Sequence, residues 1–269
     1  MTPVLEMRGV TQAYALQRRS LLGPRPQLTI LDSVDFSVKP GQAVGLVGES
    51  GAGKTTMTRI MTGLELPQTG KVLFDGRDVW DGDKGHRAAF RRAVQIVMQN
   101  PRSSLDPRMR VGVSLLEPLR SLGIAGDHAA RVQEVIDQVG LTRAALERFP
   151  HEFSGGQLQR IAIARALMPG PRVLVADEPV SALDVSIQAQ VLNLLKDLIA
   201  ELGLSLVLIA HDLSVVAYST SHVSVIAGGR IVERGAPLDL FSDPQTEETR
   251  ALVAAILTVE GGLSGQALD

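Results

Sequence analysis

The segment from Gly48 to Thr55 limits the possible folds of this chain more than any other, and it reads Gly-Glu-Ser-Gly-Ala-Gly-Lys-Thr. This is the spacing of loops that wrap a phosphate group in successive backbone N–H groups at the start of a helix. The residues before it, QAVGLVG, are typical of a short apolar strand, and Lys54 to Leu64 have helical periodicity. Strand, loop and helix follow in the order that such a loop requires, so the sequence predicts a nucleotide-binding site.

Two side chains in this loop have specific expected roles. We expect Lys54 to reach the terminal phosphates of the nucleotide, and Thr55 to ligate Mg²⁺. The glycines leave room for the backbone N–H groups to approach the phosphates. The expected nucleotide contacts of this segment are Gly48, Glu49, Ser50, Gly51, Ala52, Gly53, Lys54, Thr55 and Thr56.

Two carboxylates follow a later apolar strand. Magnesium at a phosphate-binding loop needs a further partner at the end of a neighbouring strand, and RVLVADEP places Asp177 and Glu178 there. We expect Asp177 to hold the metal, directly or through water, and Glu178 to polarise the attacking water. The alternative is a pair of solvated acids in a loop.

Two more polar side chains come after strand candidates: Gln99 after AVQIVM, and His211 after LSLVLIA. The ends of strands are where an open α/β sheet collects its ligand contacts. We predict that Gln99 contacts the metal and the water, and that His211 holds Glu178, the water and the γ-phosphate in register. The alternative is a surface polar group for Gln99 and a hydrogen-bonded structural residue for His211.

Composition excludes several other kinds of function. The 269 residues carry 27 Lys and Arg against 29 Asp and Glu, so a global basic field for nucleic acid is excluded. The sequence has no cysteine, which excludes disulfides, thiolate catalysis and cysteine-ligated zinc or iron–sulfur clusters. Charges near the first residues argue against a secretory signal, and the longest aliphatic run, Leu204 to Ala210, is too short to span a membrane. We expect a cytosolic chain unless a partner holds it at a membrane.

Apolar patterning predicts an α/β fold with a mostly parallel sheet. Residues 4–14 and 28–38 are expected to form strands joined by a polar loop, and residues 66–80 a hairpin. Residues 101–168 have helical spacing and form an insertion, after which strands and a helix alternate from RVLVADEP to HVSVIAGGRIVE. A helix from Glu247 to Leu257 and a Gly-rich tail follow. Short aliphatic strands that alternate with helices indicate a parallel sheet covered on both faces.

The segment from Phe153 to Arg160, read with the motifs above, resembles the nucleotide-binding subunit of ABC transporters, whose signature is Leu-Ser-Gly-Gly-Gln. Phe153 replaces the leucine, and Ser-Gly-Gly-Gln is intact. The match covers almost the whole chain in the family's order, with Tyr14 as the adenine-stacking aromatic, 48–55 as Walker A, Gln99 as the Q-loop, 154–157 as the signature, 173–178 as Walker B, 181–184 as the D-loop and His211 as the switch. For Tyr14 the alternative is a core aromatic on a strand.

The resemblance implies a single nucleotide-binding domain. Its parts would be a P-loop NTPase core with a mostly parallel sheet, an N-terminal antiparallel β subdomain and an inserted helical subdomain. Residues 1–100 and 171–237 would form the core with its β subdomain, and residues 101–170 the helical subdomain. Residues 238–269 would form the C-terminal helix and tail.

The resemblance also implies that two such subunits pack head to tail around ATP. The residues that would close over the nucleotide of the other chain are Ser154, Gly155, Gly156, Gln157 and Asp184. Ser154 and two glycine N–H groups at a helix start would also form a second anion-binding end on physical grounds alone. A serine-capped helix explains Ser154 but not the two glycines, which cost helix stability.

Longer strings resemble one branch of this family, the oligopeptide, dipeptide and nickel importer ATPases: QNPRSSLDPRMRV, RFPHEFSGGQLQRIAIARAL and DEPVSALDVSIQAQVLNLL. Met98 stands where that branch usually has Phe, and the C-terminal segment follows the branch only in part. The implied function is an ATPase that drives solute import, with peptides as the expected solute and nickel or a metal chelate as the alternative.

The expected partners are two transmembrane permease subunits and a second ATP-binding subunit, either a paralogue or this chain itself. An extracytoplasmic solute-binding protein would act indirectly, and no nucleic acid is expected. The chain would sit peripherally on the cytoplasmic face of the inner membrane, with Pro101 to Leu119 facing the permease. Two further classes remain open, a soluble ABC ATPase of DNA repair or translation and a binding module that has lost hydrolysis. The former usually carry two cassettes or a long coiled-coil insertion, and neither is expected from this sequence. The latter would have lost hydrolytic residues that are all present in this sequence.

Overall fold

The computed structural model describes residues 2–16, 25–81 and 83–264 of the chain. It divides the chain into two compact units. Unit 1 comprises Met1–Lys39, Ala43–Asp81 and Ile209–Asp269, and unit 2 comprises Pro40–Gln42 and Gly82–Leu208. Most of the loop predicted between the first two strands, and the end of the predicted tail, lie outside the described residues.

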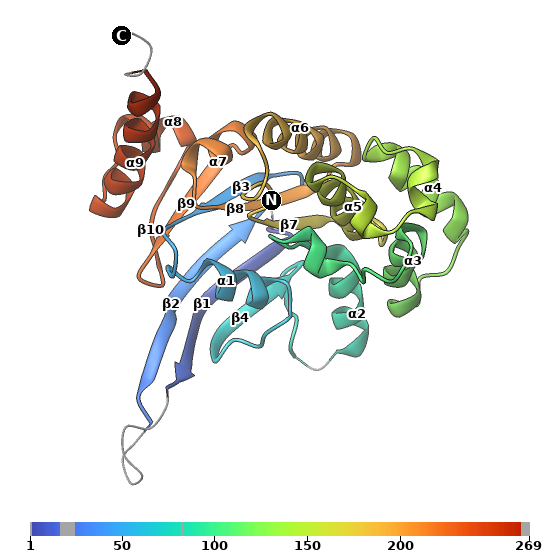
Figure 1. The fold of residues 1–269 in the computed structure, drawn as a ribbon. Coiled ribbons are helices and arrows are strands. Elements are labelled where there is room, and N and C mark those ends of the chain that lie inside the picture. Colours follow the sequence, from blue (N-terminus) through green and yellow to red (C-terminus); the bar gives the residue numbers. More distant parts are fainter. Residues whose placement is uncertain (1, 17–24, 82, 265–269) are drawn as a thin grey trace. The chain divides into compact units, whose positions relative to one another are not determined.

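Unit 1 contains an antiparallel sheet of four strands in the order β2-β1-β4-β5. The strands are β1 (Leu5–Ala15), β2 (Gln27–Val38), β4 (Thr69–Phe74) and β5 (Arg77–Asp78). Leu5 pairs with Val38 on one side and with Phe74 on the other. Leu5 and Met7 are two positions apart and are buried on one face of β1, and Val10 is buried beyond a register shift that lies between Met7 and Val10. The predicted antiparallel β region is confirmed (Figure 1).

Unit 1 also contains the strand that precedes the phosphate loop, β3 (Ala43–Val47), together with β9 (His222–Ala227) and β10 (Arg230–Gly235). β3 is parallel to β9, and β9 turns at Gly228 and Gly229 into antiparallel β10. The helices of this unit are α1 (Lys54–Met61), α7 (Leu213–Ser219), α8 (Pro237–Ser242) and α9 (Glu247–Ser264). The helix predicted to end at Leu64 therefore ends at Met61, and the one predicted to end at Leu257 continues to Ser264.

Unit 2 contains β6 (Val94–Val97), β7 (Val173–Asp177) and the first part of β8 (Ser205–Ala210). β6 and β7 are parallel, with Gln95 opposite Leu174. The helices are α2 (Lys84–Ala93), α3 (Val111–Ser121), α4 (His128–Gln138), α5 (Gly155–Leu167) and α6 (Val185–Leu202), with 3₁₀ turns at Pro101–Ser104, Arg143–Glu147 and Pro150–Glu152. The predicted parallel pairing and the helices between residues 101 and 168 are confirmed.

Helices α3, α4 and α5 pack on one another in unit 2, and Figure 1 shows them together. Leu115, Val135 and Leu158 are fully buried in this packing, one from each helix. Arg131 of α4 closes the end of α5, because its guanidinium donates hydrogen bonds to the carbonyls of Leu167 and Met168. Among the residues that the structure describes, no helix is both long enough and apolar enough to cross a lipid bilayer.

Candidate nucleotide site

The loop between β3 and α1 has backbone conformations that only its glycines adopt easily. Gly53, the residue before α1, has a φ of 109°. A Cβ atom there would lie 2.8 Å from a methyl carbon of Leu31, and one on Gly48 would lie 2.2 Å from the carbonyl oxygen of Ile226. These two glycines therefore let the loop pass close to its neighbours, which is the cradle that a phosphate site requires.

The start of α1 is open to an anion. Gly53 caps the helix and has no side chain that could take up the N–H groups of the first turn. No acidic residue lies in that turn, and the exposed Thr55 follows the cap by two positions. The positive end of the helix and the open N–H groups suit a phosphate.

Lys54 lies inside the loop rather than in solvent. Only 7% of the residue is exposed, and its ammonium group donates hydrogen bonds to the carbonyls of Gly48 (2.7 Å) and Glu49 (3.0 Å). These hydrogen bonds hold the Lys54 ammonium group against the backbone of the loop, the position from which a loop lysine contacts phosphate groups. The loop residues thus fit a bound polyphosphate, and unit 1 brings together all of the residues predicted from Gly48 to Thr56.

Tyr14 lies near this loop, at the end of β1. Its side chain is not in the core, since 37% of the residue is exposed, and its hydroxyl donates a hydrogen bond of 2.6 Å to Glu65. Burial and the Glu65 hydrogen bond raise the pKa of Tyr14, while the Thr56 hydroxyl acts on it in the opposite direction. The ring is thus half-exposed and is held through its hydroxyl by a residue that follows α1, and its stacking on adenine stays a prediction.

Glu65 is a site residue that the sequence reasoning missed. Its carboxylate also accepts a hydrogen bond from Gln12 (2.9 Å) and lies 3.2 Å from the Arg59 guanidinium. Glu65 therefore holds the Tyr14 hydroxyl from the segment that follows α1. No local pattern could reveal this contact, because it joins residues that only the fold brings together.

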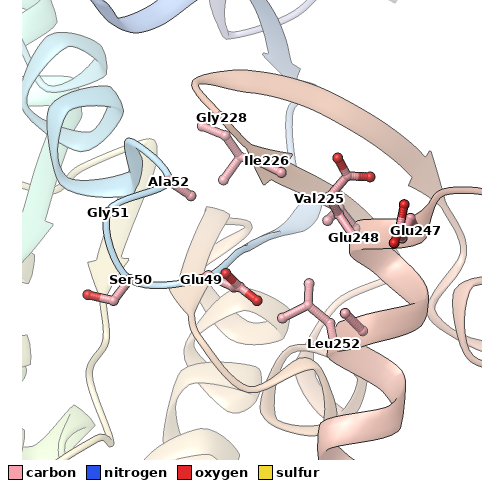
Figure 2. A pocket seen from close by; sticks show the side chains of 12 residues that line it. Glu49, Ser50, Gly51, Ala52, Val225, Ile226, Gly228, Glu247, Glu248 and Leu252 are labelled. Atoms are coloured by element: carbon pink, nitrogen blue, oxygen red, sulfur yellow. The ribbon is translucent and has the colours of Figure 1, made fainter. Parts of the chain in front are cut away.

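A pocket of about 420 Å³ opens beside the loop in unit 1 (Figure 2). One wall is the loop segment from Glu49 to Ala52, a second is the end of β9, and a third is the first turns of α9. Its charged groups are Glu49, Glu247 and Glu248. Three carboxylates would repel a triphosphate, so this pocket does not suit the phosphates of a nucleotide.

Unit 2 brings Glu178 and Gln99 into contact. The side-chain amide of Gln99 donates a hydrogen bond of 2.8 Å to a Glu178 carboxylate oxygen, and Ser181 donates one of 3.1 Å to the Glu178 carbonyl. Glu178 has a φ of 45°, a conformation that costs a glutamate energy and that is concentrated at functional sites. The carboxylate is half-buried, so it remains reachable by water.

The other two predicted strand-end residues lie where expected. Asp177 is the last residue of β7 and is half-buried. His211 follows β8 directly and is exposed, and the next residue, Asp212, caps α7 by accepting a hydrogen bond from the Ser214 N–H.

The segment from Ser154 to Gln157 starts α5 as a capping box. The Ser154 N–H donates to the Gln157 side chain at 3.1 Å, and the Gln157 N–H donates to the Ser154 hydroxyl at 3.4 Å. A Cβ on Gly156 would lie 2.5 Å from Ile187, and one on Gly155 would lie 3.2 Å from Leu183. The two glycines therefore have a packing reason, which the sequence reasoning did not foresee, in addition to the predicted contact with a phosphate.

Asp184 precedes α6 and is exposed, and its side chain makes no hydrogen bond that caps the helix. It lies in the same unit as the capping box. The contact of Leu183 with Gly155 brings the predicted signature and the predicted D-loop together.

Comparison with known proteins settles the family. Residues 31–181 match the family described as ABC transporter. The chain belongs to the ABC transporter family. It is 45% identical over 256 residues to the dipeptide transport ATP-binding protein DppF of Haemophilus influenzae, a match covering 94% of this chain and 78% of that protein.

Two further likenesses agree with this assignment. The oligopeptide transport ATP-binding protein OppF of Lactococcus lactis is 39% identical over 262 residues, covering 97% of this chain and 82% of OppF. A dimeric ATP-binding cassette solved in a post-hydrolysis state with ADP and Pi has a TM-score of 0.74 at 28% identity, covering 87% of this chain and 98% of that one. The predicted resemblance and the predicted P-loop NTPase fold class of this ABC protein are confirmed.

Proposed function

We propose that this chain is the ATP-hydrolysing subunit of a membrane importer for peptides. The observation that carries the ATPase part is the glycine loop before α1, in which Lys54 is buried against the loop carbonyls. The peptide part is supported by DppF and OppF, whose names give dipeptide and oligopeptide transport.

The residues have separate tasks in hydrolysis. Lys54 and the loop N–H groups bind the phosphates and neutralise charge that develops on them. Glu178 accepts a proton from the attacking water, while Gln99 fixes the orientation of its carboxylate. His211 positions the water and the γ-phosphate, and the Tyr14 ring stacks on adenine.

The proposed Mg²⁺ ligands are Thr55, Gln99 and Asp177, chosen for the chemistry of their side chains. One carboxylate, one hydroxyl and one amide oxygen are hard oxygen ligands, and Mg²⁺ often keeps waters and uses few protein carboxylates. When bound, the ion neutralises charge on the phosphate oxygens. Thr55 is exposed and Asp177 is only half-buried, so both can reach a ligand.

The complete site takes residues from two chains. The capping box from Ser154 to Gln157, together with Asp184, contributes to the nucleotide held by a second ATP-binding subunit, which is a paralogue or another copy of this chain. ATP then joins the two subunits, and hydrolysis releases them.

The remaining proposed partners belong to the membrane. Two permease subunits form the solute path, an extracytoplasmic solute-binding protein delivers the solute, and no nucleic acid takes part. The chain acts peripherally at the cytoplasmic face of the inner membrane. Pro101 to Leu119, which follows Gln99 in unit 2, is the segment proposed to meet the permease.

The test is ATP hydrolysis by the transporter reconstituted in vesicles, with phosphate release as the readout. We expect peptides, presented with the solute-binding protein, to stimulate hydrolysis, whereas a Lys54→Ala variant stays inactive. If nickel chelates stimulate hydrolysis and peptides do not, the proposed solute is wrong but the proposed ATPase activity stands. A wild-type chain that neither binds nor hydrolyses ATP would overturn the proposal.

A further inference from the structure

A second pocket, of about 340 Å³, lies in unit 2 between α2 and the end of α3. Its volume is at the lower end of the range for small-ligand pockets. The residues that line it are Lys84, Arg87, Ala88, Arg91, Ser121 and Leu122. The phosphate loop lies in the other unit, so the two pockets are separate features of the chain.

The pocket carries one sign of charge. Three of its six lining residues are basic, and no carboxylate is among them within the part of the chain that the structure describes. The three basic residues lie on one side of α2 because positions 84, 87 and 91 are three and four residues apart. α2 itself contains no acidic residue, and the nearest carboxylate in the sequence, Asp83, is engaged at the helix start by the N–H groups of Gly85 and His86.

Two of the basic side chains have no counter-charge. Lys84 and Arg91 are both exposed, and neither forms an ion pair with any acidic side chain in the described ranges. Like charges on one helix face destabilise the helix by repulsion. An anion in the pocket would remove that repulsion, and the guanidinium of Arg91 offers two parallel donors to its oxygens.

We propose that this pocket binds a phosphate group, carried by an anionic phospholipid or by a small phosphate ester. A phosphate accepts bidentate hydrogen bonds from arginine and a point contact from lysine, which matches the lining. The apolar surface of Ala88 and Leu122 can contact the carbon part of a glycerol group. For a subunit that works beside a membrane, a lipid headgroup is the nearest source of such a phosphate.

The experiment uses the full chain with saturating ADP, so that the phosphate loop is occupied. One arm measures co-sedimentation with vesicles of phosphatidylcholine, with or without phosphatidylglycerol. The other arm titrates sn-glycerol 3-phosphate by calorimetry. The variants are Lys84→Glu and Arg91→Glu, and Arg92→Glu is the matched control, because Arg92 is an exposed arginine of α2 that does not line the pocket.

We expect Lys84→Glu and Arg91→Glu each to weaken binding about tenfold in at least one arm. Arg92→Glu should change it by less than about threefold, because an exposed charge outside the pocket is screened. Loss in the vesicle arm alone identifies a lipid, and loss in the calorimetry arm identifies a soluble phosphate ester. Equal losses in all three variants, or no binding by the wild-type chain in either arm, would overturn the proposal. Circular dichroism and ADP binding show whether each variant is folded.

Discussion

At the scale of single residues, the carboxylate of Glu233 ties strand β10 to the start of α9. It accepts hydrogen bonds of 3.0 Å from the N–H groups of Gln245 and Thr246, and one of 2.9 Å from the Thr246 hydroxyl. Burial acts to raise the pKa of Glu233, but these hydrogen bonds and one from Thr249 outweigh it and lower the pKa from 4.5 to about 2.

This shift makes the attachment of α9 dependent on pH. Because the pKa is lower in the folded chain, the stabilisation is present above pH 4.5 and is lost as the pH falls towards 2. We expect Glu233→Gln to lower the free energy of unfolding by about 1 kcal/mol at pH 7, a value reduced for solvent screening of a half-buried group. The difference should be smaller at pH 3.

Thermal unfolding at the two pH values and amide hydrogen exchange of α9 measure this effect. Glu201→Gln is the control, since Glu201 is an exposed glutamate of α6 in the other unit. A Glu233→Gln effect of the same size at both pH values would show that the carboxylate charge is not its cause.

Residue-level prediction from the sequence is uneven for a physical reason. The phosphate loop could be recognised because its chemistry is set by eight consecutive residues, Gly48 to Thr55. Glu65 and Glu233 could not, because their partners reach them only after strands and helices have paired. The hydrogen bond from Tyr14 to Glu65, for example, joins residues 51 positions apart.

At the scale of elements, α5 approaches α6 so closely that Gly156 has a packing role between the two helices. An alanine in a helix is normally more stable than a glycine by about 1 kcal/mol. Here the added Cβ would lie 2.5 Å from the Cγ2 atom of Ile187. We expect Gly156→Ala to destabilise the chain by about 1–3 kcal/mol in the absence of nucleotide.

A double-mutant cycle separates packing from phosphate binding at this position. Ile187→Ala removes the atom that clashes, so in that background Gly156→Ala should be neutral or stabilising in denaturant unfolding. Gly155→Ala is the milder comparison, because its Cβ would lie 3.2 Å from a Leu183 methyl. If Gly156→Ala alone stabilises the nucleotide-free chain, the packing reason is wrong.

The elements that the sequence analysis missed share a weak apolar pattern. Only Phe90 and Ala93 are buried among the ten residues of α2. Two buried positions do not make a recognisable helical pattern of apolar residues. α7 and α8 span seven and six residues, too short for a helical period to repeat clearly. The long amphipathic helices α4 and α6 and the apolar strands were predictable because their buried positions recur several times.

At the scale of the whole molecule, the proposed function places the complete site between two chains. The Gly48–Thr55 loop of unit 1 and the capping box of unit 2 each lie at the start of a helix, α1 and α5, where an anion is favoured. The order of the motifs along the chain was enough to predict the fold class. The identity of the second chain that would complete the proposed site cannot be read from this sequence.

Glu178→Gln should therefore change both turnover and assembly. Removal of the proposed general base lowers ATP hydrolysis by at least about 100-fold, while the glutamine can still take a hydrogen bond from Gln99 at its amide oxygen. Because bound ATP then persists, the variant should elute as a dimer in ATP and as a monomer in ADP. Phosphate release and size-exclusion chromatography measure the two effects.

Lys54→Ala in the same background is the control, since it should stay monomeric in ATP for lack of phosphate binding. Unchanged turnover in Glu178→Gln would remove Glu178 from the mechanism. Lost turnover without a dimer would leave Glu178 as the base but contradict ATP as the link between two copies of this chain. The second ATP-binding subunit would then have to be a paralogue, and mixing the variant with that subunit should restore the ATP-dependent complex.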